Sequence, residues 1–489
     1  MCVMKKIFGF FSLGFILLAG CKKDNVSMYP SVPTDSGAVA VSSQDRVYTA
    51  DQSSNTVSVI DPSTDKLLGV IRFGKARPNI LSPLYDKEAN VHGMGISPDN
   101  HTLGVVSTLT NSVSFVDLTT NTVKGKVYVG RNPHEGFFTP DGKQFWLAVR
   151  GEDYVSVIDV NKMQEIKQIH TAKGPGMVVF RPDGKVAFVN HSFTAELDVI
   201  DTKTYEVIKK IPTVSPFSPN IAATFDGQQV WFTHKDEGKV SVVNAQTYET
   251  EGVIETGPGT NHVNFAGASG GSRYSGSAGG AFAYVTVGGE NAVKVYDRNR
   301  QLVATIPTGP NPHGVWPSGD GSKLYVGLEN GDAVDVIDTK TNTKITEIAS
   351  GEAPQALIYG VKAVAEGSDG MANLEAFVPA EPLNFRLTPN GSAPVPGVGG
   401  GVTLRTLEGI DELVLALKKL EASATYTLYL SDQKSTAINP EAVLVFKTDE
   451  KGAVEMNAYY QIKLRLTGRS FQVLKGDKNP AGEVVLSTP

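Results

Sequence analysis

Short runs of apolar and β-branched residues, separated by turn residues, recur along most of the chain. Residues 133–159 show the pattern clearly. An apolar run at Phe137 and Phe138 leads into a Pro-Asp-Gly turn at 140–142, and further apolar runs follow at 145–149 and 154–158. Glycine in such a turn allows a positive φ, and β-branched and aromatic residues suit a pleated, buried surface. The pattern predicts an antiparallel meander of short strands.

This unit recurs seven times. The acid or amide that closes its third apolar run falls at Asp61, Asp117, Asp159, Asp201, Asn244, Asp297 and Asp338, with spacings of 56, 42, 42, 43, 53 and 41 residues. The two long spacings hold insertions, one before His92 and one from Ala266 to Ala281. A period of roughly 40–45 residues with four strands is typical of propeller blades. We expect seven blades, with residues 38–41 as the innermost strand of the first. Another inner-type run at 354–359 leaves an incomplete eighth blade as the alternative.

The repeats also carry a family resemblance. Tyr-Val-Thr-Val at 284–287, Tyr-Thr-Ala-Asp at 48–51 and Tyr-Val-Gly-Leu at 325–328 each precede an alternating Val-rich run and an outer strand such as 303–309. They resemble the YVTN-repeat β-propellers, often described as surface-layer-like, over about residues 36–360. The resemblance implies the seven-bladed fold. It implies little about activity, because one fold hosts many functions.

Composition changes after Tyr359. A Gly/Pro/Ser-rich passage at 387–401 lies in a final segment whose strand-like runs are 424–432, 442–448, 461–468 and 470–476, with a turn at 449–452. Residues 407–422 fit either a helical stripe or a strand. We expect an all-β protein, the propeller spanning 37–362 and a small antiparallel β-sandwich spanning 363–489, because 489 residues exceed what one core usually serves.

The N-terminal segment resembles a bacterial lipoprotein signal. Lys5 and Lys6 precede an apolar run from Ile7 to Leu18, and Leu-Ala-Gly-Cys follows at 18–21. A basic front, a short apolar run and small residues before the cut are typical of an exported protein. We expect a signal peptide at 1–20, lipidation of Cys21 and a tether at 21–36. The protein would then reside in the bacterial cell envelope and contact the membrane through its lipid alone. No Asp directly follows Cys21, which resembles lipoproteins sorted to the outer membrane, so we expect that membrane. A plain signal peptide with a chance cysteine is the alternative.

Charge and cysteine content narrow the function classes. Cleavage before Cys21 leaves 43 basic against 51 acidic residues, and Cys2 and Cys21 are the two cysteines of the sequence. A lipidated mature chain would therefore lack a thiol for catalysis, a disulfide or a metal. A net acidic body offers no electrostatic footprint for a polyanion, so nucleic acid is not the expected partner.

Histidines gather at one predicted end of the propeller. In a meander blade, the start of the inner strand and the turn between the second and third strands lie on the same face of the disc. Four of the seven inner-strand entries are His92, His134, His262 and His313. Further residues expected on this face are Glu135, Arg150, His191, His234, Lys235 and Glu329. The sequence thus predicts a histidine-lined mouth of the central channel.

Two interpretations of these histidines stay open. They could ligate Cu, Zn or Fe, or hold an anion when protonated. Alternatively, Pro-His-Gly is the repeat's own pattern and each histidine bonds the neighbouring blade, with no cofactor. Blade 1 and blades 4 to 5 separate the pair His92 and His134 from the pair His262 and His313, which weighs against one tetrahedral site.

We expect no catalytic residues, because HExxH, P-loop and paired-carboxylate motifs are absent from the sequence. The leading hypothesis is a non-catalytic binding or scaffold module with an envelope protein or glycan as partner. The alternatives are a metal- or cofactor-binding propeller with a redox-related role, and a lactonase-like hydrolase. For the last, the Pro-Arg-His entry of seven-bladed lactonases is replaced here by Pro-His-Glu or Pro-His-Gly.

Overall fold

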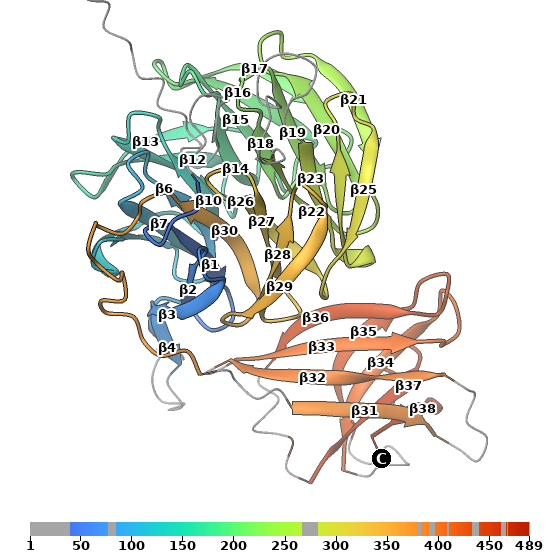
Figure 1. Ribbon diagram of the computed structural model, residues 1–489. Coiled ribbons are helices and arrows are strands. Elements are labelled where there is room, and N and C mark those ends of the chain that lie inside the picture. Colours follow the sequence, from blue (N-terminus) through green and yellow to red (C-terminus); the bar gives the residue numbers. More distant parts are fainter. Residues whose placement is uncertain are drawn as a thin grey trace, which may run out of the picture.

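The computed structural model describes residues 40–76, 85–266, 282–378, 383–390, 397–407, 410–432, 440–460, 466 and 468–488. Cys21, the signal, the tether, most of the 461–468 run and parts of both insertions lie outside these residues. No helix within the described residues is long and apolar enough to cross a membrane. The described chain forms a seven-bladed propeller and a C-terminal β domain (Figure 1).

Each blade is a four-stranded antiparallel sheet. Blades 2 to 4 contain β6 (Val91–Ile96), β7 (Thr102–Ser107), β8 (Ser112–Asp117), β9 (Thr122–Tyr128), β10 (Pro133–Phe138), β11 (Gln144–Val149), β12 (Tyr154–Asp159), β13 (Gln164–His170), β14 (Pro175–Phe180), β15 (Val186–His191), β16 (Glu196–Asp201) and β17 (Glu206–Pro212). Blades 5 to 7 contain β18 (Ile221–Ala223), β19 (Gln229–His234), β20 (Lys239–Asn244), β21 (Thr250–Glu255), β22 (Thr260–Ala266), β23 (Phe282–Val287), the 3-10 turn η1 (Gly288–Glu290), β24 (Ala292–Tyr296), β25 (Leu302–Pro307), β26 (Pro312–Pro317), β27 (Lys323–Leu328), β28 (Ala333–Asp338) and β29 (Thr343–Ala349).

The first blade is completed by the end of the propeller segment. It contains β1 (Arg46–Asp51), β2 (Thr56–Asp61), β3 (Lys66–Arg72) and, as its inner strand, β30 (Pro354–Gly360). The expectation that residues 38–41 supply this strand is wrong where it can be checked, because residues 40 and 41 form no strand. Instead β30 pairs antiparallel with β1, from Arg46 opposite Gly360 to Asp51 opposite Pro354. The pairing hydrogen-bonds the two ends of the ring, so the 354–359 run closes blade 1 and the count of seven is confirmed.

The burial pattern explains why the repeats read as continuous apolar runs. The inner, second and third strands are buried on both faces, as in β11 and β12, whereas outer strands such as β13 are largely exposed. Trp146 and Trp231, at the same position of their repeats, are 0% and 1% exposed and belong to the core between blades. Each indole donates to the glutamine two residues earlier, Gln144 at 2.9 Å and Gln229 at 3.0 Å. Gly142, in the predicted turn, has φ 71°.

The C-terminal domain is one eight-stranded sheet that curls into a nearly closed barrel or sandwich. Its order is β35-β34-β37-β38-β31-β32-β33-β36. The strands are β31 (Leu383–Pro389), β32 (Gly399–Leu407), β33 (Ile410–Lys418), β34 (Thr425–Ser431), β35 (Glu441–Lys447), β36 (Val454–Tyr460), β37 (Ser470–Lys475) and β38 (Val484–Ser487). The ambiguous 407–422 segment contains β33, so its helical alternative is wrong. Leu413, Leu415 and Leu417 point into the core of the domain.

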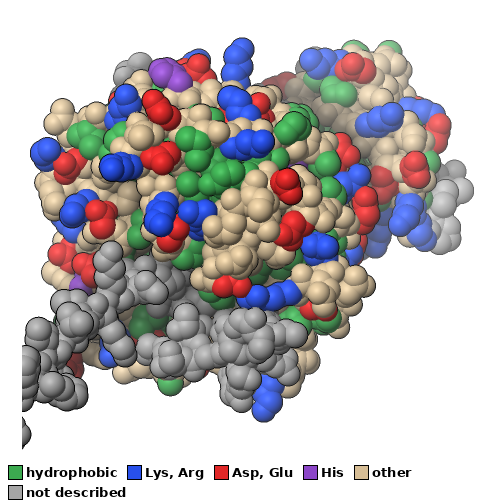
Figure 2. Space-filling model, turned by 90° about the horizontal axis from the view of Figure 1, so that it is seen from above, with side chains coloured by type: hydrophobic (Ala, Val, Ile, Leu, Met, Phe, Trp, Pro, Cys, Tyr) green, Lys and Arg blue, Asp and Glu red, His purple; other side chains and the backbone are tan. Residues whose placement is uncertain are grey.

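A connecting segment, residues 361–378, runs from β30 over the outside of blades 1 and 2. Glu375 exchanges backbone hydrogen bonds with Val70 at 2.9 Å and forms an ion pair with Arg72 at 2.8 Å. The Asn121 side chain donates to the carbonyls of Gly370 and Ala372, each at 2.9 Å. A small two-stranded sheet of β4 (Gly74–Ala76) and β5 (Tyr85–Lys87) flanks the first insertion. Acidic and basic side chains alternate over the face seen in Figure 2.

Candidate functional site

The inner strands bring all four predicted histidines to one end of the channel, which we call the histidine face. The ring centroids of His92 and His134 lie 4.4 Å apart, those of His262 and His313 lie 4.6 Å apart, and His92 lies 6.5 Å from His313. The two pairs therefore meet across blade 1, contrary to the sequence expectation that intervening blades separate them. The reason is that inner strands converge near the axis, where even blades 2 and 7 lie close together.

Strand register places the four histidines in two layers. Val91, Pro133, Thr260 and Pro312 occupy equivalent positions, each paired with the last residue of its second strand. His92, His134 and His313 follow directly, so the residue of blade 6 that matches them is Asn261. The sequence alignment of His262 with them is wrong by one residue. His262 instead shares the deeper layer with Glu135.

Hydrogen bonds to backbone carbonyls fix the tautomers of two of these rings. Nδ1 of His134 donates to the Gly176 carbonyl at 2.7 Å, and Nδ1 of His313 donates to the Gln355 carbonyl at 3.0 Å. Both acceptors lie on the inner strand of the next blade, as the structural interpretation expects. The Nε2 atoms of His134 and His313 are therefore left as acceptors, because a neutral imidazole carries one proton.

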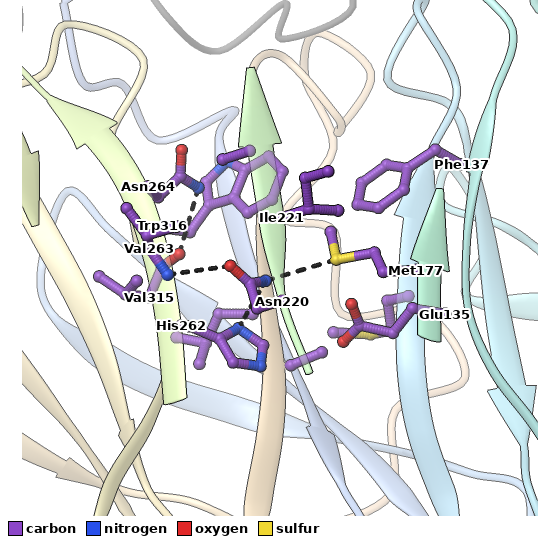
Figure 3. Close-up of a pocket in the computed structure, with 14 residues that line it drawn as sticks. Glu135, Phe137, Met177, Asn220, Ile221, His262, Val263, Asn264, Val315 and Trp316 are labelled. Atoms are coloured by element: carbon purple, nitrogen blue, oxygen red, sulfur yellow. Dashed lines mark hydrogen bonds between the residues drawn. The ribbon is translucent and has the colours of Figure 1, made fainter. Parts of the chain in front are cut away.

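The deeper layer is organised by Asn220, which the sequence analysis overlooked (Figure 3). Its Oδ1 accepts from the backbone N–H of Val263 at 2.9 Å, which orients the amide group. Its Nδ2 then donates to Nδ1 of His262 at 3.3 Å and to the sulfur of Met177 at 3.4 Å. The proton of His262 consequently resides on Nε2. The signal for Asn220 in the sequence is its place beside Pro219, at the entry of the fifth inner strand.

The channel below the mouth is narrow. Side chains of all seven inner strands surround a cavity of ≈ 20 Å³, and Glu135 and His262 point into it (Figure 3). Such a volume holds about one water molecule. The channel is thus filled by its own side chains at this depth, and an organic molecule finds room only outside it.

Burial shifts the pKa values of the titratable groups here. Desolvation lowers the pKa of His92, His134, His262 and His313 well below the ordinary histidine value, and nearby cations, mainly Arg150 and Lys235, add to the effect. Glu135 is 3% exposed, and its burial raises its pKa to about 8 against the attraction of Arg150. The four imidazoles and this carboxyl group are therefore neutral at neutral pH.

Two cations stand at the mouth without partners. The Arg150 guanidinium follows β11 and the Lys235 ammonium follows β19, and neither has an ion pair or side-chain hydrogen bond within the described part of the chain. Burial lowers the pKa of Arg150 to about 10. The mouth therefore carries net positive charge.

The remaining predicted residues of this face serve the blades or the domain contact. His191 and His234 are both 0% exposed and lie inside blades 4 and 5. His191 donates from Nδ1 to the Glu196 carbonyl at 2.7 Å, and His234 bonds Ser218 and Ser241. Glu329 accepts from Asn311 at 2.8 Å at the edge of the C-terminal domain.

The C-terminal domain docks on this face through Arg405. Its guanidinium donates to the carbonyls of Glu329, at 3.0 Å, and Asn330, and pairs with Asp332 at 3.0 Å and with Glu412 of its own domain at 3.2 Å. Asn457 on β36 adds a hydrogen bond to Asn330 at 2.9 Å. The contact holds β36 beside blade 7, where Figure 1 shows the two domains closest.

Docking leaves two adjoining cavities between the domains. The first, of ≈ 320 Å³, is lined by Lys235, Gly259, Gly288, Gly289, Asn311, Glu329, Asn330, Glu455, Met456 and Asn457. The second, an open groove of ≈ 850 Å³, continues along the ends of β32, β33, β35 and β36. Gly289 and Glu455 line both. Lys235 connects the first cavity to the histidines, since its charge acts on three of them.

Comparison with known proteins addresses the propeller type. Residues 88–266 match the family model described as YNCE-like beta-propeller. This part of the propeller is similar to that family. This agrees with the predicted YVTN-type resemblance at the level of the fold. No curated protein matches the chain.

Two solved structures are similar to parts of the chain. A functionally unknown protein from Desulfotomaculum acetoxidans DSM 771 is 13% identical, with a TM-score of 0.53, over 64% of this chain and 98% of that one. Kuenenia stuttgartiensis hydrazine synthase is 22% identical, with a TM-score of 0.49, over 55% of this chain and 90% of that one. At 13% identity, the likeness to the first structure concerns the fold alone.

No three His, Cys, Asp or Glu side chains within the described residues lie as a metal ion would require. The metal interpretation therefore stays a prediction that would need side chains to rearrange. The arrangement as it stands offers imidazole acceptors, unpaired cations and an adjoining polar cavity, which together suit binding of a polar ligand.

Proposed function

We propose that the protein is a lipid-anchored binding module of the bacterial cell envelope, without catalytic activity, whose ligand site is the histidine face together with the cavity beneath the C-terminal domain. Its partner is an envelope glycan or protein. The observation that most directly supports this proposal is the position of the ≈ 320 Å³ cavity beside the unpaired Lys235 at the channel mouth. Cavities of roughly this size at domain interfaces are common ligand sites.

The lining of the cavity favours a glycan over an apolar ligand. Asn311, Asn330 and Asn457 contribute amide groups, and Gly289 exposes backbone. Hydrolysis within the channel, as in the lactonase alternative, is disfavoured because ≈ 20 Å³ leaves no room for a lactone. The mixed charge of the surface supports the proposal that nucleic acid is not the partner (Figure 2).

The binding test uses a cavity-filling variant. Glu455 is exposed on β36 and lines both cavities, so Glu455→Trp obstructs them without disturbing a core. Glu450→Trp, on the exposed 449–452 turn, is the matched control. Glycan fragments released from the native envelope are passed over immobilised mature protein, and retention is measured by interferometry. We expect the wild type and Glu450→Trp to retain glycan and Glu455→Trp to lose it; equal retention by all three would place the site elsewhere.

Anchoring through Cys21 rests on the N-terminal pattern. Arg46, at the start of β1, pairs with Gly360, at the end of the inner strand, so the described chain enters on the face opposite the histidines. A tether at 21–36 would thus direct the histidine face away from the membrane. Metabolic labelling with an alkynyl fatty acid tests the anchor: label should appear on the wild type and vanish in Cys21→Ala, and label that persists in the variant contradicts it.

A metal- or cofactor-binding role is the second candidate. Its support is that His134 and His313 each donate from Nδ1 to a carbonyl and present a bare Nε2, which is the usual arrangement of ligating histidines. Elemental analysis of mature protein purified without chelator is the test. Copper, zinc or iron near one per chain, lost in His134→Ala, would support this role, and background levels would remove it.

A further inference from the structure

The uncompensated charge at the channel mouth indicates what kind of ligand would bind. Arg150 and Lys235 come from blades 3 and 5, and both lie close enough to His92 to lower its pKa. The carboxyl group that most affects Arg150 is Glu135, which is protonated at neutral pH because burial raises its pKa to about 8. A partly buried cation without a counter-charge is costly. An anionic group of a ligand would supply that counter-charge.

The histidines indicate a second property of the ligand, which is that it donates hydrogen bonds. His134 and His313 direct their Nδ1 protons to backbone carbonyls, so each presents an acceptor Nε2 with no partner within the described residues. An acceptor is satisfied by an O–H or N–H of the ligand. A simple inorganic anion without a proton to donate leaves these atoms unsatisfied, whereas a hydroxylated molecule satisfies them.

The cavity beside the mouth is lined by groups that could bind a charged, hydroxylated ligand. It provides amide groups of Asn311 and Asn457, the ammonium of Lys235, the carboxylates of Glu329 and Glu455 and the exposed backbone of Gly289 within ≈ 320 Å³. Amides both donate and accept hydrogen bonds, as hydroxyl groups do. The volume lies at the lower end of the usual range for small-molecule sites, which suits a molecule of one or two rings.

We infer that the ligand is a small polyhydroxylated organic anion, of the acidic-sugar type, whose anionic group lies between Arg150 and Lys235 and whose hydroxyl groups reach the Nε2 atoms of His134 and His313. This inference rests on the proposed binding function and names its ligand class. A carboxylate and a phosphate share the required charge. The experiment separates these two sources.

Isothermal titration calorimetry on the full mature chain, in buffer free of phosphate and citrate, compares glucuronate, glucose 6-phosphate and glucose. The variants are Arg150→Gln and Lys235→Gln. Matched controls are Arg131→Gln and Lys239→Gln, whose native side chains are already paired with Glu152 at 2.7 Å and Glu255 at 3.3 Å. Circular dichroism verifies that each variant folds.

We expect at least one of the two anions to bind at least about 10-fold more tightly than glucose, and each mouth variant to lose about 10-fold or more of that affinity, as expected for a charge-assisted contact. The controls should stay within about 2-fold of the wild type. Preference for glucuronate or for glucose 6-phosphate identifies the anionic group. Equal binding of glucose and the anions overturns the anionic class while the binding function stands. Absence of binding by all three overturns the inference, and the glycan retention test then judges the binding function separately.

Discussion

Replacing Glu135 with glutamine should stabilise the propeller in a pH-dependent way. The carboxyl group is buried in the channel and has no hydrogen-bond partner within the described residues, and its pKa is about 8 against an ordinary value of 4.5. A carboxyl group whose pKa is raised by folding binds its proton more tightly in the folded state. Its contribution to stability is therefore fully present below about pH 4.5 and is lost as the pH rises toward 8.

The magnitude follows from this linkage. Each pKa unit is worth about 1.4 kcal/mol. At pH 7 the free energy of unfolding of the wild type is therefore about 3 kcal/mol lower than it would be with a side chain that is neutral in both states. At pH 5 the same difference is only about 1 kcal/mol. Glu135→Gln is such a neutral side chain of nearly equal size. The variant should therefore be more stable than the wild type by these amounts, because the other titrating groups are common to both proteins.

The assay can isolate the propeller. Trp146, Trp231 and Trp316 are the three tryptophans of the sequence and all lie in propeller strands, so tryptophan fluorescence during urea unfolding reports on this domain. Glu237→Gln, on an exposed turn of blade 5, is the control and should leave stability unchanged. If Glu135→Gln unfolds at the same urea concentration as the wild type at both pH 5 and pH 7, the proposed neutral state of Glu135 is refuted.

Three further substitutions probe the contacts that build the site. His134→Ala removes the donor to the Gly176 carbonyl and should cost about 1–3 kcal/mol by tryptophan-monitored urea unfolding; an unchanged midpoint would mean that this bond is not formed in solution. Asp45→Ala removes the carboxylate that accepts the Tyr359 hydroxyl at 2.6 Å beside the ring closure, and it should lower the free energy of unfolding by about 2–3 kcal/mol in the same assay. A loss of less than about 0.5 kcal/mol, roughly the effect of an ordinary surface change, would contradict this prediction. Arg405→Ala leaves the domains without their central ion pairs and should increase the radius of gyration measured by X-ray scattering; an unaltered value would show that other contacts suffice.

The sequence predicted the fold well because local and repeated signals carry it. Apolar runs with a period near 42 residues and positive-φ turns such as that at Gly142 specify each blade independently of the others. The ring closure was missed because β30 and β1 are about 300 residues apart in sequence and both ends of the segment contain strand-like runs. In the C-terminal domain, periodicity alone left 407–422 ambiguous, and pairing of β33 between β32 and β36 decided for a strand.

The sequence by itself determined which residue types reach the histidine face, because strand order and turn position fix the direction in which each strand enters. Only the tertiary structure decided what these residues do there. Convergence of the inner strands brings His92 within 6.5 Å of His313 despite the blade between them, and a one-residue difference in register sends His262 deeper than its neighbours. Burial, which no local pattern encodes, neutralises Glu135 and leaves Arg150 without a counter-charge. The cavity at the mouth exists because a separate domain docks through Arg405, a contact between residues distant in sequence.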